Sequence, residues 1–181
     1  MRREDFEHVI RAAADVVDDE IVVIGSQAVL AVDPETSAVL LHSQELDVFP
    51  RHDPARADEI DRALGDGSPF HATYGYYAHG VGPEAVHAPD GWEARLVRVD
   101  VPQRARATGT AIAWCLEVHD LVLAKLAAGR SHDLTFVDEA IRTKLVRVDE
   151  LIGRLAEMPD RYRDPTAQRL RASITRVSQR G

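Results

Sequence analysis

The sequence predicts an α/β (α+β) fold, in which a mixed sheet flanked by helices is followed by a helical C-terminal part. Three observations carry this prediction. Short β-branched runs such as "EIVVIG" end at glycine or proline, as buried strands do. Apolar residues recur at helical spacing around those runs, and from about residue 117 onward the pattern is helical throughout. We expect an α/β core at 1–116 and a helical part at 117–181, packed as one compact unit.

The first half of the chain alternates helices and strands. Helical spacing predicts an amphipathic helix over residues 5–18, and "EIVVIG" indicates a short buried strand. The segment "SQAVLAV" then begins a helix that Pro34 closes, and a second strand around 44–49 stops at Pro50. In "PARADEIDRALG", a proline in the first turn and a glycine after the end delimit another helix.

The later elements follow from the same patterns. Residues 68–101 mix aromatics, glycines and short alternating runs, which favours strands and tight turns. Within and after that region, "ARLVRVDV" and "AIAWCLEV" are typical of strands. The remainder predicts four helices, at 117–129, 132–143, 148–157 and 165–178.

Composition restricts the class of protein. The chain has 181 residues, 45% of them hydrophobic, which suffices for a sizeable core. No stretch approaches the roughly 20 apolar residues of a membrane span, and acids interrupt the N-terminal apolar residues, unlike a signal peptide. A single cysteine, Cys115, excludes an internal disulfide and a cysteine-based zinc site. We therefore expect a cytoplasmic protein without membrane contact.

Charge is distributed unevenly. The net charge of −8 argues against a general nucleic-acid coat protein. Residues 1–94 hold 6 Lys/Arg and 19 Asp/Glu, whereas residues 95–181 hold 16 and 11. This asymmetry permits a local basic surface, although solvated arginines on helix faces would produce the same count.

Two carboxylates are the first candidates for a functional site. In "SQELDVFP", Glu45 and Asp47 are two residues apart in a predicted strand, so both project from one face while Leu46 and Val48 point to the other. Such a pair suits Mg²⁺, which prefers one or two carboxylates plus substrate phosphates. The alternative is an exposed strand face with two solvated acids.

A second candidate precedes that strand. Gly25 and Ser26 end one predicted strand and open a helix, where free backbone N–H groups favour a phosphate and glycine permits close approach. Alone this signal is weak. Together with an acidic pair on the next strand it indicates a phosphate-plus-metal arrangement suited to nucleotidyl transfer.

These segments resemble a known family. "VVIGSQAVL", "SQELDVFP" and "HDLVLAKLAAGRSHDLTFVDEAI", with the aromatic middle region, are similar to the DUF6036/AbiEii-type nucleotidyltransferase-like family. That family belongs to the polymerase-β-type nucleotidyltransferase superfamily and includes the MenT toxins of mycobacteria. The resemblance covers roughly residues 6–155 and implies the nucleotidyltransferase-like sheet.

The resemblance also implies roles for a segment in the C-terminal half. Lys125 is the only charged residue in "LVLAKLAAG", where it either extends to the surface or meets an anion. By resemblance, Lys125 and Asp133 are active-site residues, with Lys125 facing nucleotide phosphates and Arg130 supporting it. For Asp133, a position in the first turn of the next helix is an alternative explanation.

One position departs from the superfamily pattern. The first metal-binding acid there is nearly always aspartate, whereas this chain has Glu45, which is one methylene longer. Eighteen residues separate Ser26 from Glu45, a longer spacing than usual. Either feature is compatible with weakened or lost catalysis, because Mg²⁺ requires a near-ideal octahedron.

Three further sets of residues are weaker candidates. Ser43 is a candidate for phosphorylation, since related toxins carry a modifiable hydroxyl there, and a phosphate would compete with nucleotide. Asp100 is either a third carboxylate or a solvated strand acid. The histidines are scattered without H-x-x-x-H spacing, so the sequence predicts no zinc site from them: His42, His52, His71, His79 and His87.

By resemblance, the chain transfers NMP from an NTP to the 3′ end of tRNA with Mg²⁺, and is the toxin of a toxin–antitoxin pair with a cognate antitoxin protein. The basic balance after residue 94 is compatible with an RNA approach surface. Two alternatives remain open. One is a degenerate protein that binds nucleotide or a partner without catalysis, and the other is a nucleotidyltransferase that modifies a protein or small molecule.

Overall fold

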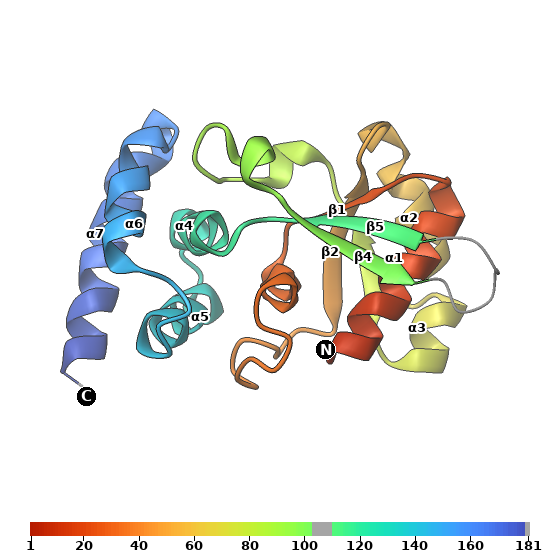
Figure 1. Ribbon diagram of the computed structural model, residues 1–181, viewed down its shortest axis with the longest axis horizontal. Helices are drawn as coiled ribbons and strands as arrows, with labels where there is room; N and C mark the ends of the chain where they lie inside the picture. The colour runs from red at the N-terminus through yellow and green to blue at the C-terminus, as the bar shows by residue number, and fades with distance from the viewer. Residues whose placement is uncertain (103–109, 180–181) are drawn as a thin grey trace. The chain divides into compact units, whose positions relative to one another are not determined.

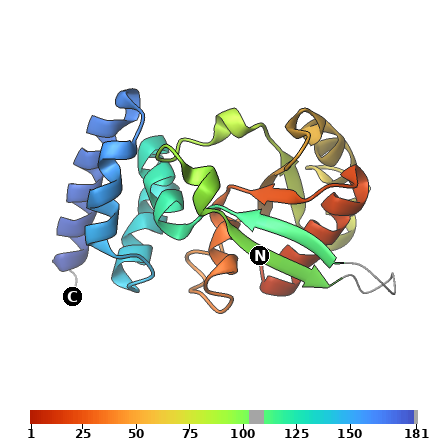
Figure 2. The same ribbon diagram turned by 45° about the horizontal axis from the view of Figure 1, so that its top comes forward.

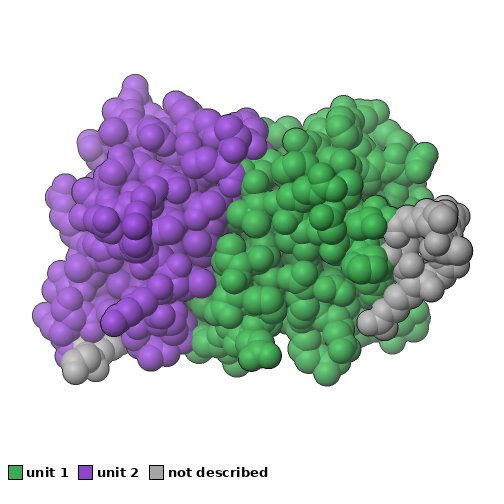
Figure 3. Space-filling model, viewed as in Figure 1, with its two compact units in different colours: residues 1–85, 96–116 green, residues 86–95, 117–181 purple. Residues whose placement is uncertain are grey.

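The structure is a computed structural model that describes residues 1–102 and 110–179. The chain divides into two compact units (Figure 3). Unit 1 comprises Met1–Ala85 and Leu96–Leu116, and unit 2 comprises Val86–Arg95 and Glu117–Gly181. Unit 1 contains a mixed five-stranded sheet and unit 2 contains helices, which confirms the predicted fold class.

The sheet of unit 1 combines parallel and antiparallel pairs (Figure 1). Its order is β3-β2-β1-β5-β4. The strands are β1 (Ile21–Val23), β2 (Glu45–Pro50), β3 (Tyr77–Gly80), β4 (Val97–Pro102) and β5 (Thr110–Cys115). Strand β2 pairs antiparallel with β1 and parallel with β3, while β5 pairs parallel with β1 and antiparallel with β4.

Two helices cover one face of this sheet. Helix α1 (Arg3–Val17) buries its apolar stripe, and α2 (Ala57–Leu64) packs against β3. A Cβ at Gly80 would lie 2.1 Å from the Ala57 carbonyl oxygen, so glycine allows this close approach. The strand residues on the covered face are buried, among them Leu46, Val48, Ala78, Val99, Val101, Ala113 and Cys115. Side chains at the alternating positions project from the opposite face.

Residues 68–76 correct the sequence-based interpretation. Strands and turns were expected, but Pro69–Tyr74 forms a short helix, α3. The Ser68 hydroxyl accepts a hydrogen bond from the His71 N–H, Pro69 occupies the first helical position, and Gly75 ends the helix at φ 76°. These are ordinary start and stop signals, which the surrounding aromatics obscured.

Three other helices differ in type or extent from the prediction. Ser26–Ala31 is a 3₁₀ helix, η1, and the helix expected from Pro54 begins as a 3₁₀ turn, η2 (Pro54–Arg56). Helix α7 was expected to start at Pro165, yet it spans Asp160–Ser178 with that proline inside. Its extra first turn is held by hydrogen bonds from the N–H groups of Tyr162 and Arg163 to the Pro159 carbonyl.

Unit 2 consists mainly of helices, drawn in teal to blue in Figure 2, and α4 packs against three others. Its helices are α4 (Val118–Ala128), α5 (Ser131–Arg142), α6 (Val148–Arg154) and α7, with the 3₁₀ turns η4 (Trp92–Arg95) and η5 (Leu155–Glu157). Helix α4 packs against α5, α6 and α7 through buried side chains that include Leu121, Val122, Leu126, Phe136, Val137, Leu151 and Leu170. In the described residues, no helix combines the length and apolar character that crossing a membrane requires.

Candidate active site

The two predicted carboxylates lie together on strand β2. Leu46 and Val48 are buried beneath the helices, so the period-2 alternation of the strand directs Glu45 and Asp47 to the opposite face. About a third of each carboxylate side chain is exposed, 35% for Glu45 and 32% for Asp47. The strand therefore presents a pair of acids that solvent and a ligand can reach.

Strand β3 adds a histidine to this pair. The parallel register places His79 opposite Asp47. His79 Nδ1 lies 2.7 Å from Glu45 Oε1 and 3.1 Å from Asp47 Oδ1. One ligand atom from each residue lies within 4.8 Å of the other two, which is close enough for a shared metal ion. We call Glu45, Asp47 and His79 the β2–β3 cluster.

The electrostatics of the cluster favour bound positive charge. Burial raises the pKa of Glu45 above its usual value, and repulsion from Asp47 raises it further. Burial alone would lower the pKa of His79, but its hydrogen bond with Asp47 and the attraction of Glu45 outweigh this effect and raise the pKa. The negative charge of each carboxylate is destabilised by repulsion from the other, and a cation between them removes this repulsion.

Gly25 approaches the cluster from the end of β1. The Ile24 N–H donates a 3.1 Å hydrogen bond to the Asp47 carbonyl, which holds the two segments together. A Cβ built at Gly25 would lie 2.1 Å from Asp47 Oδ2. Ser26 follows directly and starts η1, with Gly25 in extended backbone at its N-cap. The two predicted halves of the site in unit 1, glycine turn and acid pair, are thus adjacent.

Ser43 lies just before the acid pair and organises its backbone. The Ser43 hydroxyl accepts a 3.0 Å hydrogen bond from the Glu45 N–H and donates a 3.2 Å bond to the Glu45 carbonyl. The residue is half-buried. This turn fixes the entry into β2, and phosphorylation of Ser43 stays a prediction.

The predicted lysine and aspartate form an ion pair in unit 2. Lys125 Nζ on α4 lies 2.9 Å from Asp133 Oδ1 on α5, and the side chains are 14% and 5% exposed. The Lys125 ammonium also lies 4.9 Å from the centre of the Phe136 ring. Asp133 Oδ2 accepts a 3.3 Å hydrogen bond from the backbone N–H of Arg130, whose side chain is exposed.

Asp100 lies at the opposite edge of the sheet from the β2–β3 cluster. It is on β4, whereas β3 forms the other edge. The Arg98 guanidinium donates hydrogen bonds of 3.0 and 2.8 Å to Asp100 Oδ1. The third atom that could bind a metal beside the acid pair belongs instead to His79, which the sequence did not single out. Its only signal was a place in the short alternating run "YAHG".

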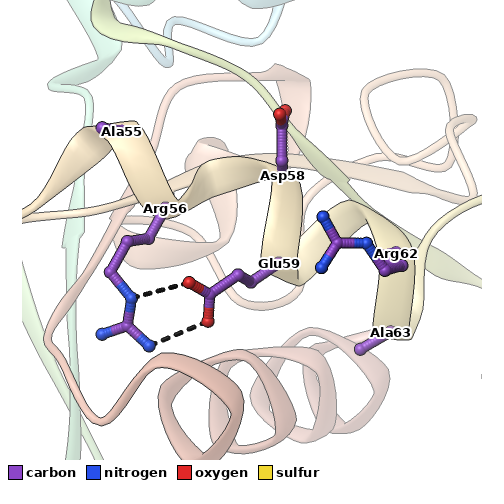
Figure 4. A pocket seen from close by; sticks show the side chains of 6 residues that line it. All are labelled: Ala55, Arg56, Asp58, Glu59, Arg62 and Ala63. Carbon is purple, nitrogen blue, oxygen red and sulfur yellow. Dashed lines mark hydrogen bonds and ion pairs between the residues drawn. The ribbon is translucent and has the colours of Figure 1, made fainter.

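A surface depression on α2 contains none of the predicted residues (Figure 4). Arg56 and Glu59 on its wall form a two-pronged ion pair with hydrogen bonds of 2.9 and 2.8 Å. These two groups satisfy each other at an exposed position, and such surface pairs contribute little. The depression is lined by none of the acids or the histidine of the β2–β3 cluster. The β2–β3 cluster is the stronger candidate.

A comparison with protein families supports a functional class. A family model described as "Nucleotidyltransferase of unknown function (DUF6036)" matches residues 4–177. That match spans nearly the whole chain and includes the β2–β3 cluster, Gly25 and the Lys125–Asp133 pair. Neither the search of curated proteins nor the search of solved structures found a match.

Proposed function

Because this chain belongs to the DUF6036 family of nucleotidyltransferases, we propose that it transfers a nucleoside monophosphate from an NTP to the 3′ end of tRNA. One observation carries the choice of site: two carboxylates and an imidazole converge beside a glycine that leaves room for them. Such a group suits a divalent cation that faces phosphate oxygens.

In this proposal Glu45 and Asp47 hold the cation, which we take as Mg²⁺. The fit rests on the carboxylate oxygens, which lie close together on side chains that are about a third exposed. When bound, the cation supplies positive charge to triphosphate oxygens. Backbone N–H groups after Gly25, including that of Ser26, bind a phosphate, as expected where a strand ends at glycine.

By the family resemblance, Lys125 and Arg130 are proposed to bind nucleotide phosphates. Lys125 and Arg130 neutralise charge as the acceptor hydroxyl attacks the α-phosphate and pyrophosphate leaves. Asp133 orients Lys125, and the 2.9 Å ion pair supports that orienting role. Positioning and charge stabilisation account for most of the catalysis in phosphoryl transfer.

The biological role is proposed on the family resemblance alone. The protein acts in the cytoplasm as the toxin of a toxin–antitoxin pair, and a cognate antitoxin binds it. Expression of the wild type in cells is expected to arrest growth, and Asp47→Asn is expected to relieve the arrest. Growth arrest by Asp47→Asn at equal protein level would contradict a toxin that acts through nucleotidyl transfer.

A labelling experiment tests the reaction and its acceptor together. The protein is incubated with Mg²⁺, each labelled NTP in turn, and total cell RNA, protein and metabolites. We expect label in the tRNA fraction with the wild type and none with Asp47→Asn. Asp100→Asn is the matched control, since Asp100 is an acid at the far edge of the same sheet and should not affect labelling.

The same experiment separates the alternatives. Label in protein or metabolites instead of RNA would replace the acceptor but keep the reaction. No label with any NTP, combined with calorimetric binding of NTP, would identify a nucleotide-binding protein without catalysis. The second outcome, binding without catalysis, is expected if Glu45 in place of aspartate has abolished the reaction.

A further inference from the structure

Histidine at position 79 gives the β2–β3 cluster a nitrogen donor. His79 lies on β3 in direct register with Asp47, so the backbone pairing of two neighbouring strands fixes its position. Its Nδ1 atom faces both carboxylates at 2.7 and 3.1 Å. The cluster therefore contains two oxygen donors and one nitrogen donor rather than oxygens alone.

The spacing of these donors matches a first coordination shell. Neighbouring ligands around an octahedral ion with bonds of about 2.1 Å lie about 3 Å apart. The two contacts of His79 Nδ1 bracket that value, and all three donor atoms lie within 4.8 Å of one another. The side chains are 32–46% exposed, so an ion can enter from solvent and keep open positions for phosphate oxygens.

Donor chemistry then determines which ion the cluster prefers. Carboxylates suit Mg²⁺ and Mn²⁺ alike, whereas imidazole is a ligand of first-row transition ions and not a usual partner of Mg²⁺. We propose that the β2–β3 cluster selects a divalent first-row transition ion over Mg²⁺, with His79 as its nitrogen ligand. This inference rests on the proposed function and revises its cofactor.

The longer side chain of Glu45 is consistent with such a site. Glu45 Oε1 is the carboxylate atom closest to His79 Nδ1, at 2.7 Å. The extra methylene lets the Glu45 carboxylate reach the imidazole of His79 on β3, so that both side chains can bind one ion. In this view the length of Glu45 and the nitrogen donor of His79 together define a metal site that differs from a pair of aspartates.

Direct metal binding tests the proposal without nucleotide. Mn²⁺ is titrated into the metal-free full chain while electron paramagnetic resonance records the unbound ion, and Mg²⁺ is added as competitor. We expect Mn²⁺ to bind about tenfold or more tightly than Mg²⁺. His79→Ala should lower Mn²⁺ affinity about tenfold or more and change Mg²⁺ affinity by no more than about twofold.

A matched control and a spectroscopic signature complete the test. His52→Ala removes a histidine that contacts one carboxylate, Asp19, at 2.6 Å in the same unit, and it should leave Mn²⁺ affinity unchanged. Electron spin-echo modulation from imidazole nitrogen should appear with Mn²⁺ in the wild type and disappear in His79→Ala. Circular dichroism checks that both variants are folded.

Three results would overturn the inference: equal affinity for the two ions, absence of nitrogen modulation, or tighter Mn²⁺ binding by His79→Ala. The last would show that His79 competes with the ion as a positive charge. These outcomes are distinct from failure of the proposed function, in which no NTP is transferred with either ion although Mn²⁺ binds through nitrogen. Transfer supported by Mg²⁺ without nitrogen coordination would keep the function and reject this metal preference.

Discussion

Gly25 and Asp47 occupy adjoining space at the end of β1, where a Cβ atom on residue 25 would lie 2.1 Å from Asp47 Oδ2. The backbone bond from the Ile24 N–H to the Asp47 carbonyl fixes this approach. Glycine is needed here for space and not for backbone conformation, since its φ is −80°. Glycine at position 25 therefore leaves space for the Asp47 carboxylate in the candidate site.

Gly25→Ala is expected to disturb the site more than the fold. The closest clashing atom, Asp47 Oδ2, is the end of a flexible side chain and can rotate away. The new methyl would still lie 3.0 Å from Asp47 Cβ, so the two strand segments must also separate by a few tenths of an ångström. We expect the free energy of unfolding to change by less than about 1 kcal/mol, while divalent-metal affinity and nucleotide transfer fall at least about tenfold.

Gly153→Ala serves as the control for this substitution. Apart from its chain neighbours and the backbone of its own helix, no described atom lies within 4 Å of a Cβ at Gly153, which is in helix α6. Alanine favours a helix over glycine by up to about 1 kcal/mol, so unfolding by urea should show equal or higher stability with unchanged activity. Full metal binding by Gly25→Ala would show that Asp47 does not need its observed position.

The acid pair was predictable from sequence because its geometry is local. Two residues in one strand share a face by the period of the strand alone, so Glu45 and Asp47 needed no knowledge of their neighbours. His79 joins them through the register of β2 with β3, and it lies thirty-two residues after Asp47 in the sequence. Pairing between distant segments is not encoded in either segment's own pattern.

Helix α3 shows the same limit in a different form. Its cap, proline and terminal glycine were all visible in the sequence, but they surround six residues among aromatics that suit strands equally well. For Lys125, the sequence correctly indicated an unusual charge in an apolar stretch. The sequence did not predict the ion pair of Lys125, because the pairing with Asp133 depends on how α4 packs against α5.

Breaking the Lys125–Asp133 pair is expected to destabilise the protein. Lys125→Met leaves the carboxylate of Asp133, which is only 5% exposed, without its cation. Removal of one partner of a buried pair costs about 3 kcal/mol, which urea unfolding would measure. The double variant Lys125→Met/Asp133→Leu should recover most of the loss, because it removes both charges.

Lys144→Met is the matched control, since Lys144 is the other lysine of the chain and is exposed. It should change stability by no more than about 0.5 kcal/mol. NTP affinity separates the two roles of Lys125: loss of affinity in the stable double variant supports contact with phosphates. Unchanged affinity there would restrict the pair to structure.

Stability is expected to fall in acid through Glu117, the N-cap residue of α4. Burial would raise the pKa of Glu117, but hydrogen bonds and charges from His119 and Arg154 outweigh burial and lower the pKa from 4.5 to about 2. A carboxyl with a lowered pKa stabilises the fold at neutral pH, and this contribution is lost as pH falls from about 4.5 to about 2.

Urea unfolding across that pH window measures the effect. A pKa change of this size corresponds to about 3 kcal/mol at most, and solvent screening reduces the expected loss to about 2 kcal/mol. Glu117→Gln should be less stable than the wild type at pH 7 and show a flatter dependence between pH 4.5 and 2. Parallel pH profiles for the two proteins would exclude Glu117 as the source.

Glu45→Asp tests whether the longer acid belongs to a working site. Shortening the side chain by one methylene moves the carboxylate away from His79 Nδ1, which lies 2.7 Å from Glu45 Oε1. It also moves the carboxylate away from the place where it would bind a metal ion together with Asp47. We expect measurable nucleotide transfer in the wild type with Mg²⁺ or Mn²⁺, and at least about a tenfold drop in the variant, because ligand geometry governs the affinity of such ions. If the wild type is instead inert with every NTP in both metals, and Glu45→Asp restores transfer, then Glu45 is a decayed ligand and the natural protein binds nucleotide or a partner without catalysis.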